Sequence, residues 1–139
     1  VEAVTPKPLG QVISERTSRL ITAMLVNVVE NGHGKRAGVA GHYIAGKTGT
    51  AQIPNPNGQG YLKDATIGSF VGYGPTDQPQ FVMLVKIDRP QTVQYAESSA
   101  APIFGELAKD LVRILEIPPE RAVKTVVVPQ ASSTTAVQP

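Results

Sequence analysis

The run Lys47-Thr48-Gly49-Thr50 combines an amine, two hydroxyls and a glycine, residues that could take part in chemistry. With the preceding residues, the segment 41–48 fits the pattern glycine, four residues, Gly-Lys-Thr, which forms the phosphate-binding loop of many nucleotide-binding proteins. Such a loop must open a helix, so that backbone N–H groups at the helix start meet the phosphates. On an extended strand at a sheet edge, the same residues would instead border a cleft for a peptide-like ligand, which could lie there as an added strand.

The residues after the motif argue against a helix. Between Gly49 and Gly60 the chain carries three glycines and two prolines, which disfavour helical structure. The four spacer residues 42–45 are bulky and partly apolar and suit a strand better than a glycine-rich loop. The apolar run 81–88 ends in an aspartate, as magnesium-binding strands do, but buried strands of many kinds share that pattern. Nucleotide binding therefore stays as a remote alternative.

Composition limits the function classes. The chain has 139 residues, of which 41% are hydrophobic and 17% charged, as expected for one globular domain. A net charge of +2 with scattered basic residues gives no reason to expect nucleic acid as a partner. Without cysteine, and without paired histidines at ligand spacing, we expect no disulfide, metal or cofactor. The chain begins at Val1, and we expect it to be a piece of a longer protein.

Two helices and three strands are predicted around the motif. Ser14 is a suitable N-cap for a helix over 14–30, and a second apolar stripe predicts a helix over 101–116. Strands are expected at 43–53, 67–73 and 80–87, with loops at 54–65 and 74–79 and the third strand buried on both faces. The pattern predicts an α+β fold with an antiparallel meander. Val126 to Val128 could add a short strand.

Five segments in a fixed order carry a family resemblance. They are Val12-Ile-Ser-Glu, Val28-Val-Glu-Asn-Gly-His-Gly, Ala45-Gly-Lys-Thr-Gly-Thr-Ala-Gln, Ser69-Phe-Val-Gly-Tyr-Gly-Pro and Ser99-Ala-Ala-Pro-Ile-Phe. In these the chain resembles the C-terminal part of the transpeptidase domain of class B penicillin-binding proteins, of the cell-division type. The resemblance implies a fragment of the penicillin-binding transpeptidase and serine β-lactamase-like fold over residues 1–119. The simple composition of residues 120–139 predicts a low-complexity, disordered tail. Further N-terminal strands would then continue the sheet beside the third strand.

The resemblance also implies roles for the motif. Lys47 would place positive charge below the cleft and help to move a proton between hydroxyls, and the backbone N–H of Thr50 would be an oxyanion donor. The hydroxyls of Thr48 and Thr50 would bind the terminal carboxylate of a D-Ala-D-Ala stem peptide or of a β-lactam. Gly49 would let the ligand backbone approach closely, and Gln52 would be a further contact.

The nucleophile of this family is not found in the chain. No serine is followed by lysine at the third position, and no Ser-x-Asn is present. We therefore expect the acylated serine, its lysine base and a membrane anchor to lie outside this chain, which alone would be inactive. The resemblance implies the extracytoplasmic face of a bacterial cytoplasmic membrane, with stem peptides, β-lactams, the rest of its own domain and the cell-division machinery as partners.

Two departures from the family pattern are visible. His33 stands where the family usually has threonine, and Tyr95-Ala96-Glu97 replaces a more glycine-rich Tyr-Tyr-Gly-Gly stretch. Two related functions stay open beside the transpeptidase. One is a D,D-carboxypeptidase or β-lactamase-like hydrolase that passes the acyl group to water, and the other is a penicillin-sensing domain without catalysis.

Overall fold

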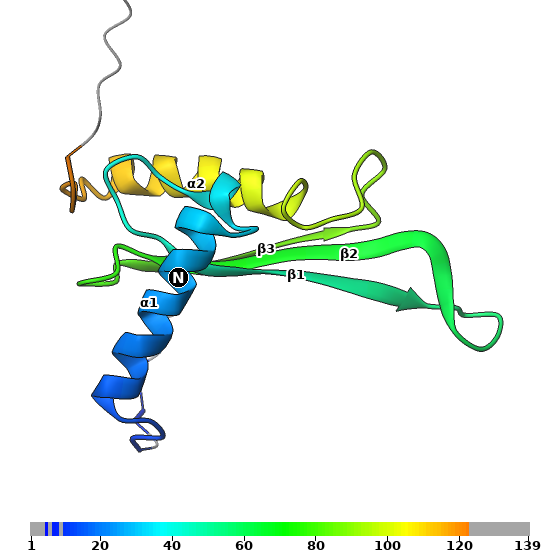
Figure 1. Ribbon diagram of the computed structural model, residues 1–139, viewed down its shortest axis with the longest axis horizontal. Coiled ribbons are helices and arrows are strands. Elements are labelled where there is room, and N and C mark those ends of the chain that lie inside the picture. The colour runs from blue at the N-terminus through cyan, green and yellow to red at the C-terminus, as the bar shows by residue number, and fades with distance from the viewer. Residues whose placement is uncertain (1–4, 6, 9, 123–139) are drawn as a thin grey trace, which may run out of the picture.

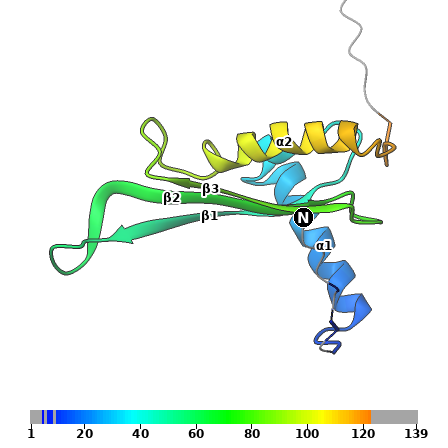
Figure 2. The same cartoon turned by 180° about the vertical axis from the view of Figure 1, so that it is seen from behind.

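The computed structural model describes residues 5, 7–8 and 10–122. Its elements are α1 (Glu15–Asn31), the short 3-10 helix η1 (Lys35–Ala37), β1 (Ala45–Pro54), β2 (Tyr61–Gly74), β3 (Phe81–Asp88) and α2 (Ala100–Ile114). The strands form one antiparallel sheet in the order β1-β2-β3. In Figures 1 and 2, α2 lies along one face of the sheet, while α1 crosses the sheet near one end and projects beyond the other face. The predicted α+β meander is confirmed.

Local capping explains where α1 begins and ends. The Ser14 side chain accepts a hydrogen bond from the Thr17 N–H at 3.1 Å, so the predicted N-cap is confirmed. At the other end, the Gly32 N–H donates to the Val28 carbonyl at 3.0 Å. A Cβ on Gly32 would lie 2.9 Å from that carbonyl oxygen, so a side chain there would disturb the helix end. The chain turns at this point towards η1, which the sequence pattern did not predict.

The core lies between the sheet and α2. Phe70 of β2 and Phe104 of α2 are both fully buried, with ring centroids 4.7 Å apart. Two glycines make room for this pair. A Cβ on Gly46 would lie 2.5 Å from the Phe70 ring, and one on Gly72 would lie 2.9 Å from the Phe104 ring. Close packing of α2 on the sheet therefore requires glycine at these strand positions.

The predicted loop at 54–65 is confirmed only for residues 55–60, and its ends are strand. β2 begins at Tyr61, which pairs with Pro54 across a register irregularity between Gln52 and Pro54. The result is a long two-stranded arm that extends beyond the three-stranded part of the sheet (Figure 1). The residues of this arm are mostly exposed, so backbone pairing rather than an apolar face forms it, and no hydrophobic alternation marks it in the sequence.

The prediction that β3 is buried on both faces is also wrong for this chain. Val85 is buried, but Val82 and Leu84 are 76% and 64% exposed. Val71, which is the cross-strand partner of Leu84, is 47% exposed as well. Within the part of the chain that the structure describes, this apolar face of the sheet is uncovered. An uncovered apolar face of this kind is typical of an interaction surface.

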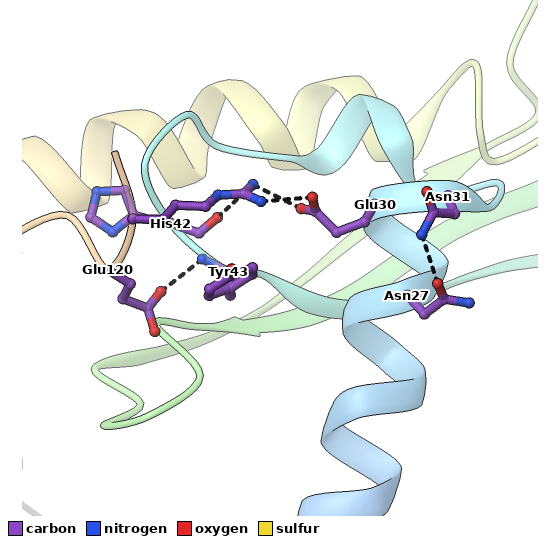
Figure 3. Close-up of polar contacts among 7 residues, drawn as sticks. Asn27, Glu30, Asn31, His42, Tyr43 and Glu120 are labelled. Carbon is purple, nitrogen blue, oxygen red and sulfur yellow. Dashed lines mark hydrogen bonds and ion pairs between the residues drawn. The ribbon is translucent and has the colours of Figure 1, made fainter. Parts of the chain in front are cut away.

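A polar brace fixes the entry to β1. Arg121 donates two hydrogen bonds to the Glu30 carboxylate, at 2.7 and 2.8 Å, and its guanidinium lies 4.5 Å from the centroid of the Tyr43 ring. Glu120 accepts from the Tyr43 N–H at 2.7 Å. Figure 3 shows these contacts converging where α1 ends and β1 begins. The hydrogen bonds from Arg121 hold the pKa of Glu30 below its ordinary value, against the opposing effect of burial.

The brace also bears on the division of the chain. Glu120 and Arg121 were assigned to the tail, yet both are hydrogen-bonded to the folded part, including N–H groups that donate to the Gly41 carbonyl. The boundary between domain and tail stays a prediction. The strand proposed at 126–128 and the end of the chain lie outside the described residues.

Candidate active site

The Lys-Thr-Gly-Thr motif lies on β1, which is an edge strand of the described sheet. Lys47 folds back along its own strand, where its Nζ donates to the Thr48 carbonyl at 2.8 Å and to Thr48 Oγ1 at 3.3 Å. The backbone groups of residues two apart point to the same edge of a strand. The Thr50 N–H therefore points to the same edge as the Thr48 carbonyl, away from β2.

The two threonine side chains share one face, as strand alternation predicts. They line a hollow of about 330 Å³. Four further residues complete its wall: His33, Tyr95, Ala96 and Glu97. Thr50 Oγ1 accepts a hydrogen bond from the Ala96 N–H at 3.2 Å. Since a hydroxyl carries a single proton, this contact leaves the Thr50 proton available for another acceptor.

The loop residues 95–97, which form the wall of the hollow opposite β1, pack directly on β2. Ala96 is fully buried, and a Cβ on Gly68 would lie 3.4 Å from its Cα and 2.5 Å from Ser99 Oγ. That Ser99 hydroxyl in turn donates to the Tyr95 carbonyl at 3.0 Å. The sheet therefore fixes the distance between the threonine hydroxyls and the loop that precedes α2.

The structure separates the five residues singled out from the sequence. Thr48 and Thr50 line the hollow, whereas Lys47 and Gln52 do not, and Gln52 is exposed further along the strand. Gly49 has a packing role besides the predicted one, because a Cβ there would lie 2.7 Å from Ser69 Oγ on β2. The described residues contain no cluster of histidine and acidic side chains that could hold a metal ion.

None of the four wall residues was predicted as a site residue, and two of them, His33 and Glu97, contact each other. His33 Nδ1 lies 2.5 Å from Glu97 Oε2, although the two residues are 64 positions apart in the sequence. Both belong to the segments that depart from the family pattern, and this was the only signal that the sequence offered. The departures therefore meet at one end of the hollow beside Thr48 and Thr50.

Comparison with known proteins adds independent evidence. Residues 2–109 match the family described as penicillin binding protein transpeptidase domain. Stage V sporulation protein D of Bacillus subtilis is 40% identical over 122 residues, which cover 87% of this chain and 19% of that protein. Peptidoglycan D,D-transpeptidase FtsI of Escherichia coli is 33% identical over 117 residues, which cover 83% of this chain and 20% of that protein. The chain thus spans about a fifth of the length of these relatives.

Solved structures agree with the fold. Penicillin-binding protein 3 of Mycobacterium tuberculosis, complexed with ampicillin, superposes with a TM-score of 0.72 at 32% identity, covering 92% of this chain and 31% of that one. The transpeptidase domain of Burkholderia pseudomallei penicillin-binding protein 3 also gives 0.72, at 33% identity, covering 81% and 34%. The long family match, the shared sheet and the motif on its edge strand lead to one conclusion: the chain belongs to the penicillin-binding protein transpeptidase family.

Proposed function

We propose that this chain is the C-terminal part of a peptidoglycan D,D-transpeptidase that cross-links stem peptides by serine acyl transfer and binds β-lactams. One observation carries the proposal. The Thr48 and Thr50 hydroxyls line a single hollow beside an edge of β1 that has no strand partner among the described residues. Relatives named as D,D-transpeptidases support the reaction type.

In the proposed reaction a serine hydroxyl attacks the carbonyl carbon of the D-Ala-D-Ala peptide bond. The C–N bond breaks, the amine leaves as D-alanine after taking a proton, and an acyl-serine remains. An amine of a second stem peptide then attacks the acyl carbon, releases the serine and forms the cross-link. A β-lactam acylates the same serine, but its ring opening leaves no free leaving group.

The residues of β1 would serve the acyl donor. The Thr50 N–H would bind the oxyanion that develops on the attacked carbonyl, a contact that contributes about 3 kcal/mol in comparable sites. The hydroxyls of Thr48 and Thr50 would donate to the ligand carboxylate, and Lys47 would supply positive charge close to them. Gly49 would let the ligand backbone lie against the strand as an added strand. Gln52, further along β1, would contact the distal part of the ligand.

The nucleophile and its base would come from upstream residues of the same protein. The uncovered apolar face of the sheet, formed by Val71, Val82 and Leu84, supports this arrangement, because such a face needs a covering element. Residues preceding this chain would cover it, and further strands would continue the sheet beside β3. The chain would therefore need its upstream part both to complete the core and to react.

The relatives suggest the cellular setting. A sporulation protein and several proteins named FtsI or FtsI homolog support an envelope enzyme of the division type. The proposed location is the extracytoplasmic face of the cytoplasmic membrane, with an anchor outside this chain and contacts to the division machinery. Within the described residues, no helix has the length and apolar character to span a bilayer.

Product analysis tests the reaction and separates it from its closest alternative. The full-length protein is supplied with a synthetic stem pentapeptide, with and without an amine acceptor such as D-amino acids or glycine. Transpeptidation predicts that D-alanine release is accompanied by an acyl–amine product whose share rises with acceptor concentration. Release of D-alanine with only the hydrolysed tetrapeptide would instead indicate a carboxypeptidase, and no release would favour the sensing domain.

A further inference from the structure

The wall of the hollow carries a carboxylate beside the hydroxyls that are proposed to bind an anion. Glu97 lines the hollow with Thr48 and Thr50, and its Oε2 contacts His33 Nδ1. We propose that Glu97 is a specificity-determining residue, which favours ligands with a cationic group near this wall over ligands with an anionic group, and that His33 is its positioning residue. The inference rests on the proposed function, because it assumes that ligands dock at Thr48 and Thr50.

The backbone that carries Glu97 is held in place. The preceding residue, Ala96, is fully buried and donates its N–H to Thr50 Oγ1 at 3.2 Å. The glycine beneath it, Gly68, leaves the space in which Ala96 and Ser99 pack on the sheet. Glu97 is therefore one residue away from a direct hydrogen bond to a ligand-binding hydroxyl, and its backbone cannot shift without breaking that contact.

The side chain of Glu97, by contrast, needs a partner to be fixed. It is 41% exposed, so without a contact it would populate several rotamers. Lys35 and Arg36 line a second hollow that also includes His33 and Glu97, and they would compete for the carboxylate. Because an ionised carboxylate can only accept, His33 donates from Nδ1 in the observed contact. That hydrogen bond keeps the carboxylate between the two hollows instead of turned to the cations.

The pair is poorly suited to a purely structural role. The His33 side chain is 83% exposed, and exposed ion pairs contribute little to folding stability. A carboxylate at the rim of a binding hollow, however, changes the affinity of charged ligands directly. Every ligand that docks a carboxylate at Thr48 and Thr50 meets the same repulsion from Glu97. A difference between ligands arises only from a second charged group, which is why charge on the remainder of the ligand decides selectivity.

Three penicillins that differ at one carbon provide the probe. Benzylpenicillin carries no charge on its side chain, ampicillin carries an ammonium group there, and carbenicillin carries a carboxylate. The second-order acylation rate of the full-length protein is measured for each by intact mass against time. We expect the ratio of ampicillin to carbenicillin rates to fall about fivefold in Glu97→Gln, which is the size of effect that an exposed charge pair supports.

Substitutions of His33 test the positioning role. His33→Ala removes the donor, and the rate ratio should fall towards that of Glu97→Gln. His33→Gln keeps an N–H donor and should retain most of the parent ratio. Glu106→Gln is the matched control, because Glu106 is an exposed carboxylate on α2 that pairs with Lys109 and does not line the hollow. It should leave the ratio unchanged.

The outcomes separate the inference from the proposed function. If the parent is acylated but Glu97→Gln leaves the ratio unchanged, the selectivity role of Glu97 is overturned. If His33→Ala and His33→Gln give the same ratio, the positioning role of His33 is overturned. If no penicillin acylates the full-length parent, the proposed function fails and the inference fails with it. All the substituted side chains are exposed. Thermal unfolding of each variant verifies that the rate ratio is measured on folded protein.

Discussion

The backbone N–H of Ala96 donates to Thr50 Oγ1 at 3.2 Å, so the loop before α2 is tied to the motif strand at a hydroxyl that lines the hollow. A hydroxyl that accepts in this way is oriented, and its own proton is left for an acceptor in the hollow. The hydroxyls of Thr48 and Thr50 therefore have different hydrogen-bond partners. Thr48 contacts Lys47 Nζ, whereas Thr50 is aligned by a backbone group from another part of the chain.

Removing the Thr50 hydroxyl should weaken ligand docking. Thr50→Val keeps the shape of the side chain but removes the donor to the ligand carboxylate and the acceptor for Ala96. A hydrogen bond to a charged group contributes about 1.5–3 kcal/mol, so acylation of the full-length protein by benzylpenicillin should slow about 10- to 100-fold. Thr50→Ser keeps the hydroxyl and should stay within about threefold of the parent. Equal rates in the two variants would exclude the proposed carboxylate contact.

A side chain at Gly49 should clash with the neighbouring strand. In Gly49→Ala, the new Cβ would lie 2.7 Å from Ser69 Oγ, which must rotate away, so the variant should lose no more than about 1 kcal/mol of unfolding free energy. Ser69→Ala removes the clashing oxygen, so the double variant should recover most of that loss. Urea unfolding of the four proteins gives the coupling energy. Purely additive losses would show that Ser69 is not the reason for glycine at this position.

The Glu30–Arg121 brace should make stability depend on pH. The pKa of Glu30 is lowered in the folded state. Glu30 therefore stabilises the fold at pH values above its unfolded pKa, and this contribution is lost as the pH falls through the folded pKa. Glu30→Gln should therefore flatten the acid limb of the stability profile, measured by urea unfolding at several pH values. Arg121→Ala should cost about 1–3 kcal/mol at neutral pH, since it leaves a half-buried carboxylate without its partner.

Arg19→Ala is the control for the brace. It removes a pair with Glu15 in which both side chains are more than 70% exposed, and it should change the unfolding free energy by less than about 0.5 kcal/mol. If Arg19→Ala and Arg121→Ala had equal effects, or if Glu30→Gln left the acid limb unchanged, the brace would have no special role in holding the entry to β1.

The uncovered face of the sheet should make the isolated chain associate. Leu84→Lys places a charge in that face and should reduce the apparent mass of the isolated chain in size-exclusion chromatography with light scattering. Tyr61→Lys, an equally drastic change on the exposed hairpin arm, should have little effect. In the full-length protein, where we propose that this face is covered, Leu84→Lys should instead lower the free energy of unfolding. A monomeric parent chain would contradict the need for a covering element.

Local signals in the sequence predicted the elements that depend on local physics. Ser14 and the apolar stripe located α1, and the change from helical to strand periodicity located β1 and the Phe81–Asp88 strand. The arm that starts at Tyr61 was missed, because backbone pairing alone forms it and its polar side chains carry no periodic pattern. Burial of β3 was overestimated because its apolar sequence indicates burial, whereas Val82 and Leu84 have no covering element among the described residues.

The features of the site also fall into those that a local pattern predicts and those that only the folded chain brings together. The shared face of Thr48 and Thr50 follows from strand alternation and needed no structure. The contact between His33 and Glu97 joins loops 64 residues apart, and only the folded sheet brings them together. The Ala96 hydrogen bond to Thr50 likewise depends on the absence of a side chain at Gly68, which no local pattern links to the motif.

The most direct test of the upstream nucleophile is the intact mass of two proteins after incubation with excess benzylpenicillin: this chain, and the same chain extended upstream to include a Ser-x-x-Lys sequence. We expect one penicilloyl adduct on the extended protein, on the serine of that sequence, and none on the present chain. An adduct on a serine of the present chain would contradict the proposed upstream nucleophile. An unlabelled extended protein would contradict the acyl-transfer function itself.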